Sequence, residues 1–347
     1  MATRRAFLAG LAAAALPRMT WADAGSPAWL AAGKAEGGHV LHGLSLAGDS
    51  VFSLPLPARG HAAAAHPVRP LAVAFARRPG TFALVLDCAR GHVTHRLTPP
   101  PGRQFNGHGA FSADGTLLMT SEVVAESSAG RIGLWETSGF TRVGEWDSGG
   151  IGPHDLKRLP DGRIVVANGG IATDPQDRSK LNLDTMRPNL AFLSDRGAVE
   201  DLVELPPDLH RNSIRHLALL PDGVAFAMQW EGDPAEPVPL LGLWRNGAVR
   251  LCEPDPAEMF TMQGYAGSIA AVAGKVAISS PRGGAVMVFA ADGRPLATHR
   301  RADICGLAPL DGDFIASDGG GGLWRVAEAL HPLRAAPLAW DNHIVPV

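Results

Sequence analysis

The chain has 347 residues, of which 46% are hydrophobic and 19% are charged, and this balance excludes an intrinsically disordered protein. Its 31 lysine and arginine residues against 34 aspartate and glutamate residues give a formal net charge of −3, so it lacks the basic field that binds nucleic acid. The 41 glycines and 28 prolines, scattered without a fixed period, predict many turns and disfavour a helical bundle.

The first 24 residues have the pattern of an export signal. Arg4 and Arg5 precede an apolar run from Leu8 to Leu16, and Ala22-Asp23-Ala24 then provides the small residues of a cleavage site. The apolar run is about half of the roughly 20 residues that a membrane-spanning helix needs. We therefore expect a twin-arginine signal, export to the bacterial periplasm and no membrane span.

A hairpin signal recurs along the rest of the chain. Each copy has an apolar strand, an Asp-Gly turn and a second apolar strand, and Asp-Gly supplies the backbone angles of a tight antiparallel turn. The turns are Asp114-Gly115, Asp161-Gly162, Asp222-Gly223 and Asp311-Gly312. One strand later, Gly-Leu-Trp recurs at 133–135, 242–244 and 322–324. These marks predict units of about 40 to 55 residues with four strands each, the size of a β-propeller blade.

Counting the units predicts one all-β domain over residues 25–347, a seven-bladed β-propeller. Six blades are expected to begin near His61, His108, His154, Ile214, Ser268 and Ile304. Residues 25–60 supply only three strands, so we expect the apolar strand near 338–347 to complete blade one and close the ring. A division into two domains at the insertion from Gly169 to Arg187 is the alternative, although the repeat resumes directly after it.

Histidine recurs at one position of the repeat, close to the start of the inner strand. The inner strands of a propeller line its central channel, so residues that share a repeat position gather at one mouth of the channel. This position holds His61, His108, His154 and His216, and the closing strand contributes His343. Blades six and seven have Ser268 and Cys305 there instead.

This clustering predicts a transition-metal site, because neutral imidazole is a ligand for zinc, copper, iron and nickel. The predicted ligands are His61, His108, His154, His216 and His343, with Cys305 as a further soft ligand and Asp155 and Asp341 as nearby carboxylates that bind or orient them.

A second interpretation stays open, in which the histidines bond to one another, to carbonyl groups and to water, and fill a polar channel without metal. The repeat register adds a further alternative. Relative to the hairpin turn, His61 and His154 lie one residue earlier than His108 and His216. In this alternative, one of the two pairs faces the strand stack instead of the channel.

Several longer motifs resemble those of the exported β-propellers known as domain of unknown function 1513. The matching segments are Arg77–Ala83, Gly107–Gly109, Ile151–Leu156, Val166–Ile171, Lys180–Pro188, Ser213–Ala218 and Ser279–Gly283. The resemblance covers essentially the whole chain after the signal. It implies a periplasmic propeller that is a neighbour of imelysin-type periplasmic proteins tied to iron acquisition, favours iron or copper over zinc, and supplies no catalytic residue.

Three functions follow from these patterns, in order of preference. The first is non-catalytic metal handling at the histidine-lined channel mouth. The second is an interaction scaffold of a periplasmic iron-uptake system that docks a protein partner through the 170–188 insertion. The third is a metal-dependent oxidoreductase, which needs an open coordination position and a substrate pocket. We expect a monomer that does not bind nucleic acid and has no membrane span.

Overall fold

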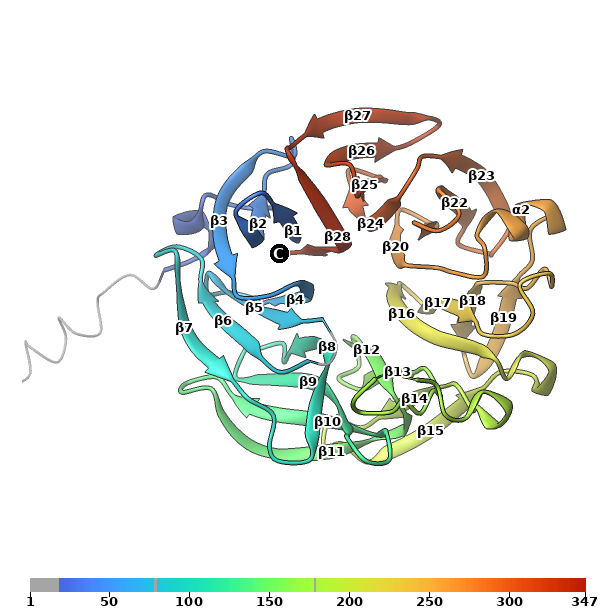
Figure 1. Ribbon diagram of the computed structural model, residues 1–347, viewed down its shortest axis with the longest axis horizontal. Coiled ribbons are helices and arrows are strands. Elements are labelled where there is room, and N and C mark those ends of the chain that lie inside the picture. The colour runs from blue at the N-terminus through green and yellow to red at the C-terminus, as the bar shows by residue number, and fades with distance from the viewer. Residues whose placement is uncertain (1–18, 78–79, 178) are drawn as a thin grey trace, which may run out of the picture.

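Short apolar strands joined by tight turns form a ring of seven four-stranded antiparallel sheets (Figure 1). The computed structural model describes residues 19–77, 80–177 and 179–347. The predicted seven-bladed β-propeller is confirmed. The predicted Asp-Gly turns connect the first two strands of their blades, and Gly115 and Gly162 have the positive φ values, 70° and 96°, that such turns require.

The strands of the first four blades have the following bounds. Blade one contains β1 (Trp29–Ala35), β2 (Gly38–Leu44), β3 (Ser50–Leu56) and β28 (Leu338–Pro346). Blade two contains β4 (Gly60–Ala65), β5 (Leu71–Ala76), β6 (Ala83–Asp87) and β7 (His92–Leu97). Blade three contains β8 (Arg103–Phe111), β9 (Leu117–Val124), β10 (Ala129–Glu136) and β11 (Thr141–Ile151). Blade four contains β12 (Pro153–Arg158), β13 (Ile164–Asn168), β14 (Asn189–Leu193) and β15 (Val199–Glu204).

The remaining three blades follow the same order. Blade five contains β16 (Asn212–Leu220), β17 (Gly223–Trp230), β18 (Leu241–Arg245) and β19 (Ala248–Cys252). Blade six contains β20 (Ser268–Val272), β21 (Lys275–Ser280), β22 (Ala285–Ala290) and β23 (Pro295–Arg300). Blade seven contains β24 (Ile304–Leu310), β25 (Asp313–Asp318), β26 (Gly322–Val326) and β27 (Leu330–Ala335). The helices are η1 (Trp21–Ala24), η2 (Leu183–Thr185), η3 (Pro207–Leu209) and α2 (Pro256–Thr261).

The C-terminal strand closes the ring, as the sequence predicts. β28 pairs antiparallel with β1, so that Ile344 lies opposite Ala31 and Trp340 opposite Gly33. The side chains of Trp340 and Ile344 are buried. Figure 1 shows the C-terminus beside blade one, on the channel side of its sheet. The first blade is therefore built from both ends of the described chain.

The apolar core lies between neighbouring blades and leaves the centre of the ring to the inner strands. One core cluster, for example, joins Phe75 and Val85 of blade two to Phe105, Leu118 and Trp135 of blade three. Neighbouring inner strands lie side by side around the axis. The side chains that the inner strands present to the channel are consequently free to be polar without weakening the core.

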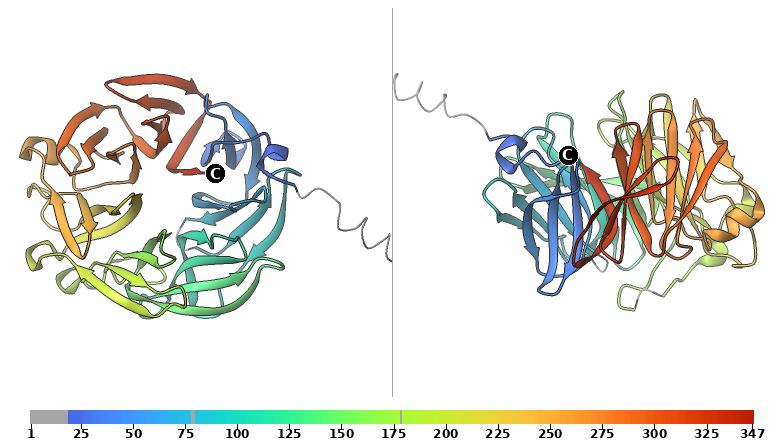
Figure 2. Two further views of the ribbon diagram at one scale, coloured as in Figure 1. Left: turned by 180° about the vertical axis from the view of Figure 1, so that it is seen from behind. Right: turned by 90° about the horizontal axis from the view of Figure 1, so that it is seen from above.

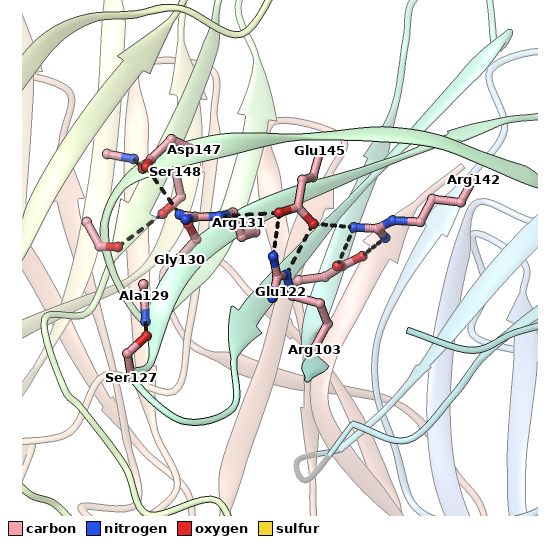
Figure 3. A network of polar contacts seen from close by, with 12 residues as sticks. Arg103, Glu122, Ser127, Ala129, Gly130, Arg131, Arg142, Glu145, Asp147 and Ser148 are labelled. Atoms are coloured by element: carbon pink, nitrogen blue, oxygen red, sulfur yellow. Dashed lines mark hydrogen bonds and ion pairs between the residues drawn. The ribbon is translucent and has the colours of Figure 1, made fainter. Parts of the chain in front are cut away.

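A buried ion pair ties the strands of blade three together (Figure 3). Glu122 on β9 is fully buried, and Arg142 on β11 donates to both of its carboxylate oxygens at 2.8 and 3.0 Å. The Thr120 hydroxyl donates to the same carboxylate at 2.6 Å. Glu145 accepts bonds from Arg142 and from Arg103 on β8. Because a buried carboxylate is stable only when it is paired, we interpret this network as structural.

Two predicted segments are only partly described. Residues 1–18 of the predicted export signal lie outside the described residues, as do Arg78 and Pro79 of one motif quoted above. In the remainder of the signal, η1 packs on blade two, where the Trp21 indole donates to the carbonyl of His66 at 2.9 Å. No helix in the described part of the chain is long and apolar enough to cross a bilayer.

The insertion of blade four separates two strands of one sheet. It connects β13 to β14, and these strands pair with each other, with Asn168 opposite Asn189. Its segment (yellow-green) projects from one face of the ring, and the C-terminus lies toward the opposite face (Figure 2). The two faces of the channel thus have different surroundings.

Candidate metal centre

Backbone irregularities set the direction of the channel histidines. The ladder between the first two strands shifts register at His61 in β4, at His108 in β8, at His154 in β12 and just before His216 in β16. β28 has a similar shift opposite β1, in the segment that holds His343. Such bulges turn a side chain relative to the regular pleat. They explain why histidines that differ by one residue in repeat register still meet.

The five imidazole rings form one cluster. The ring centroid of His108 lies 4.6 Å from that of His154, 4.9 Å from His343, 5.0 Å from His61 and 5.7 Å from His216. The pairs His154–His216 and His61–His343 are each 4.6 Å apart. Four of the rings are buried and His61 is half-buried. Residues up to 282 positions apart are therefore neighbours.

Two overlapping histidine triads could hold a metal ion. In His61–His108–His343 and in His108–His154–His216, one nitrogen from each ring lies within 4.8 Å of the others. Nitrogens that bind one ion at about 2.1 Å in tetrahedral geometry are about 3.4 Å apart, so the rings of a triad would move closer together to share an ion. His108 belongs to both triads.

Each ring also has a buried nitrogen with no hydrogen-bond partner among the described residues. These atoms are His61 Nδ1, His108 Nε2, His154 Nδ1, His216 Nδ1 and His343 Nε2. A buried polar atom without a partner costs free energy, and proteins seldom contain several together without a water or an ion. The donor set therefore fits a transition-metal ion that prefers imidazole.

Asp155 is placed to orient His108. Its Oδ1 lies 3.5 Å from His108 Nδ1 and 3.3 Å from Lys157 Nζ, and the amide of Leu217 donates to Oδ2 at 3.0 Å. Burial alone would raise the pKa of Asp155, but Lys157 and His108 outweigh it and hold this pKa well below its usual range. A carboxylate on Nδ1 leaves Nε2 of His108 available to a metal.

Cys305 and Asp341 lie elsewhere in the inner-strand layer. The Cys305 thiol donates to the carbonyl of Asp341 at 3.4 Å, and burial raises its pKa to about 12. The Asp341 carboxylate accepts from Arg59 Nε at 2.6 Å. Ser268 accepts from the amide of Leu307 at 3.2 Å. Among the described residues, none of the three joins a histidine triad.

Two residues of the site were missed in the sequence. Gly107 has φ +97°, and a Cβ atom there would lie 2.5 Å from His61 Cδ2, so only glycine permits this ring to approach. The Gly-His-Gly pattern at 107–109 was the available signal. Lys157, two residues after Asp155, brings a positive charge to the site and had no repeat pattern to reveal it.

Acid is expected to destabilise the fold through the buried histidines. Burial, followed by the charges of neighbouring imidazoles, lowers the pKa of His61, His154, His216 and His343 well below 6.5. Below pH 6.5 the unfolded chain therefore binds protons that the folded chain does not, and stability falls as the pH falls. Each histidine contributes up to about 1.4 kcal/mol per pH unit. Urea unfolding of the metal-free chain at pH 7 and pH 5 measures the loss.

A matched variant assigns the acid effect to these rings. Replacing His154 and His216 with glutamine should flatten the pH dependence of the unfolding free energy, while replacing the exposed His92 and His95 of β7 should leave it unchanged. An equal pH dependence in all three proteins would contradict the explanation.

One family model matches the chain, and solved structures share its fold. A family model described as "Protein of unknown function (DUF1513)" matches residues 54–347. A chain of the Kuenenia stuttgartiensis hydrazine synthase is 13% identical with a TM-score of 0.62, over 83% of this chain and 89% of that one. BamB from Moraxella catarrhalis is 11% identical with a TM-score of 0.53, over 86% and 82%.

A chain of the mitotic checkpoint complex is 9% identical with a TM-score of 0.57, over 80% of this chain and 77% of that one. These likenesses show the fold alone. No curated protein matches the sequence significantly.

Proposed function

Since the chain belongs to the DUF1513 family, whose function is unknown, we propose from its own geometry that the propeller binds a transition-metal ion at the channel histidines. The observation that supports this proposal most strongly is the cluster of five imidazole rings. Each ring has a buried nitrogen that lacks a hydrogen-bond partner among the described residues. The lowered pKa values of four of them support the proposal, because imidazole must be neutral to bind a metal.

We favour copper or iron as the ion. A donor set of imidazoles suits both, and copper binds most tightly among the divalent ions of the first transition row. Zinc is the less favoured alternative. The Arg4-Arg5 signal supports a periplasmic setting, in which the protein would hold the ion without chemical turnover.

Metal analysis of the purified protein tests this proposal. The full chain is expressed with its own signal, recovered from the periplasm, loaded with Cu²⁺, Fe²⁺ or Zn²⁺, and freed of unbound ion before elemental analysis. We expect close to one ion per chain at micromolar metal. The double variant His108→Ala with His154→Ala should bind none and keep the circular dichroism spectrum of the wild type.

The control is the double variant His92→Ala with His95→Ala, which removes two exposed imidazoles of β7 and should retain full metal. Stable protein that takes up none of the three ions at micromolar concentration would refute the proposal. Loss of metal in the control would show that the ion is bound at the surface instead.

A docking role for the insertion is a second candidate function. Lys180 pairs with Glu231, and Asp184 pairs with Arg211, so ion pairs hold this segment against blade five. Between these pairs Leu181 is 61% exposed, an apolar side chain on a projecting segment. Capture of a periplasmic partner that depends on Leu181 and survives the loss of His108 and His154 would favour this role.

A further inference from the structure

We propose that the metal centre takes a second ligand, a small organic carboxylate with an apolar body that binds in the cavity beside the histidines. This inference rests on the proposed metal site and specifies what the free side of the ion would meet. It is drawn from the position, the lining and the charge of one cavity.

The cavity runs along the channel axis and has a volume of about 380 Å³. All seven inner strands contribute to its wall, and most of the lining side chains are apolar, among them Ala62, Ala110, Leu217, Ala270 and Ile344. A cavity of this size lined by apolar side chains and a few polar ones is typical of a site for a small organic molecule. Water molecules gain little free energy from contact with these apolar side chains.

The cavity begins at the histidine cluster. His108, His216 and His343 belong to its lining, and the other lining residues follow these positions along their strands. It therefore extends from the histidines toward the ends of the inner strands, where Leu219 is 38% exposed. An ion held by three imidazoles keeps at least one coordination position, and the cavity gives a ligand access to it.

The charges at the inner end of the cavity favour an anion. Among the described residues of the lining, the charged ones are Asp155 and Lys157. The Asp155 carboxylate is engaged by His108, by backbone amides and by Lys157 Nζ at 3.3 Å, so the charges of Asp155 and Lys157 balance, and the Lys157 side chain is 40% exposed. A bound divalent ion then leaves this end of the cavity with excess positive charge. A single carboxylate is the head group that balances this charge and also binds the ion.

Ligand binding to the copper-loaded protein tests the inference. Three probes are compared. Benzoate has a carboxylate and an apolar ring, acetate has the carboxylate without the ring, and benzyl alcohol has the ring without a charge. Benzoate should change the electron paramagnetic resonance spectrum of the bound Cu²⁺ and bind at least about tenfold more tightly than acetate, because its ring is buried against the apolar wall. Benzyl alcohol should leave the spectrum unchanged.

Two variants separate this site from the metal site. Lys157→Met should weaken benzoate about tenfold, through loss of one charged contact, with the affinity measured on protein that is fully loaded with copper. Ala110→Phe places a ring at a half-buried position of the cavity wall and should abolish benzoate binding with copper retained. Ala335→Phe makes the same change on exposed β27 and should bind both normally.

The outcomes are distinguishable. Equal affinity of benzoate and acetate for copper-loaded protein, or unchanged benzoate affinity in both Lys157→Met and Ala110→Phe, would overturn the inference and leave the metal site standing. If Ala110→Phe fails to fold, the Lys157→Met result decides. Failure to load copper at all would count against the proposed function instead.

Discussion

Replacing His108 with glutamine is expected to weaken metal binding more than replacing any other channel histidine. His108 belongs to both triads, so its loss leaves neither complete. The affinity should fall by more than the roughly 10- to 100-fold that is typical when only an outer-shell partner is removed. Competition of the protein against a chelator for Cu²⁺ measures the dissociation constant.

Three further variants are compared with His108→Gln in their affinity for Cu²⁺. His61→Gln and His154→Gln each leave one triad intact, so each should lose no more than about tenfold in affinity. Asp155→Asn keeps all five imidazoles but removes the carboxylate 3.5 Å from His108 Nδ1, and should lose about 10- to 100-fold. Equal losses for His61, His108 and His154 would contradict the shared-ligand geometry, and unchanged affinity in all four variants would contradict the site.

Removing residues 338–347 is expected to prevent the chain from folding. The truncation deletes β28, exposes the edge of β1 and removes two buried apolar side chains, Trp340 and Ile344. Truncating a buried tryptophan alone costs about 3 to 5 kcal/mol, a large share of the roughly 5 to 15 kcal/mol by which domains are stable. The full truncation should therefore yield protein without a cooperative urea transition.

The single variant Trp340→Ala tests the same contact in a chain that still folds. Its indole also donates to the carbonyl of Gly321 at 3.2 Å, so the unfolding free energy should fall by at least about 3 kcal/mol. Deleting Val347 alone, beyond the end of β28, should cost less than about 1 kcal/mol. A truncated chain with native spectra and wild-type stability would show that the ring closes by another route.

Local turn chemistry made the fold predictable from the sequence. Asp114-Gly115 and its relatives mark the same hairpin in successive blades, and their spacing gives the size of the repeat. The first blade lacks one strand, and the C-terminal strand belongs to no other blade. The two are therefore expected to pair, because an open ring would leave two free sheet edges. The pairing of β28 with β1 confirms this reasoning.

The candidate site was only partly predictable, because repeat position gives the level of a residue along the channel but not the direction of its side chain. The same position holds His343 and Cys305, yet the imidazole joins the cluster while the thiol turns to the Asp341 carbonyl. The ladder shifts register at Cys305 as well as at the histidines, and such bulges have no simple sequence signal. Lys157 and the cavity arise from strands of several blades, so no single motif contains them.

An ion bound through the closing strand would stabilise the whole closed ring. β28 provides both His343 and the strand pairing with β1 that joins the two ends of the described chain, so an ion bound through His343 would have to leave before this pairing opens. At a free metal concentration a thousand times the dissociation constant, this linkage adds about 4 kcal/mol to the closed state. Hydrogen exchange along blade one would then report the occupancy of the metal site.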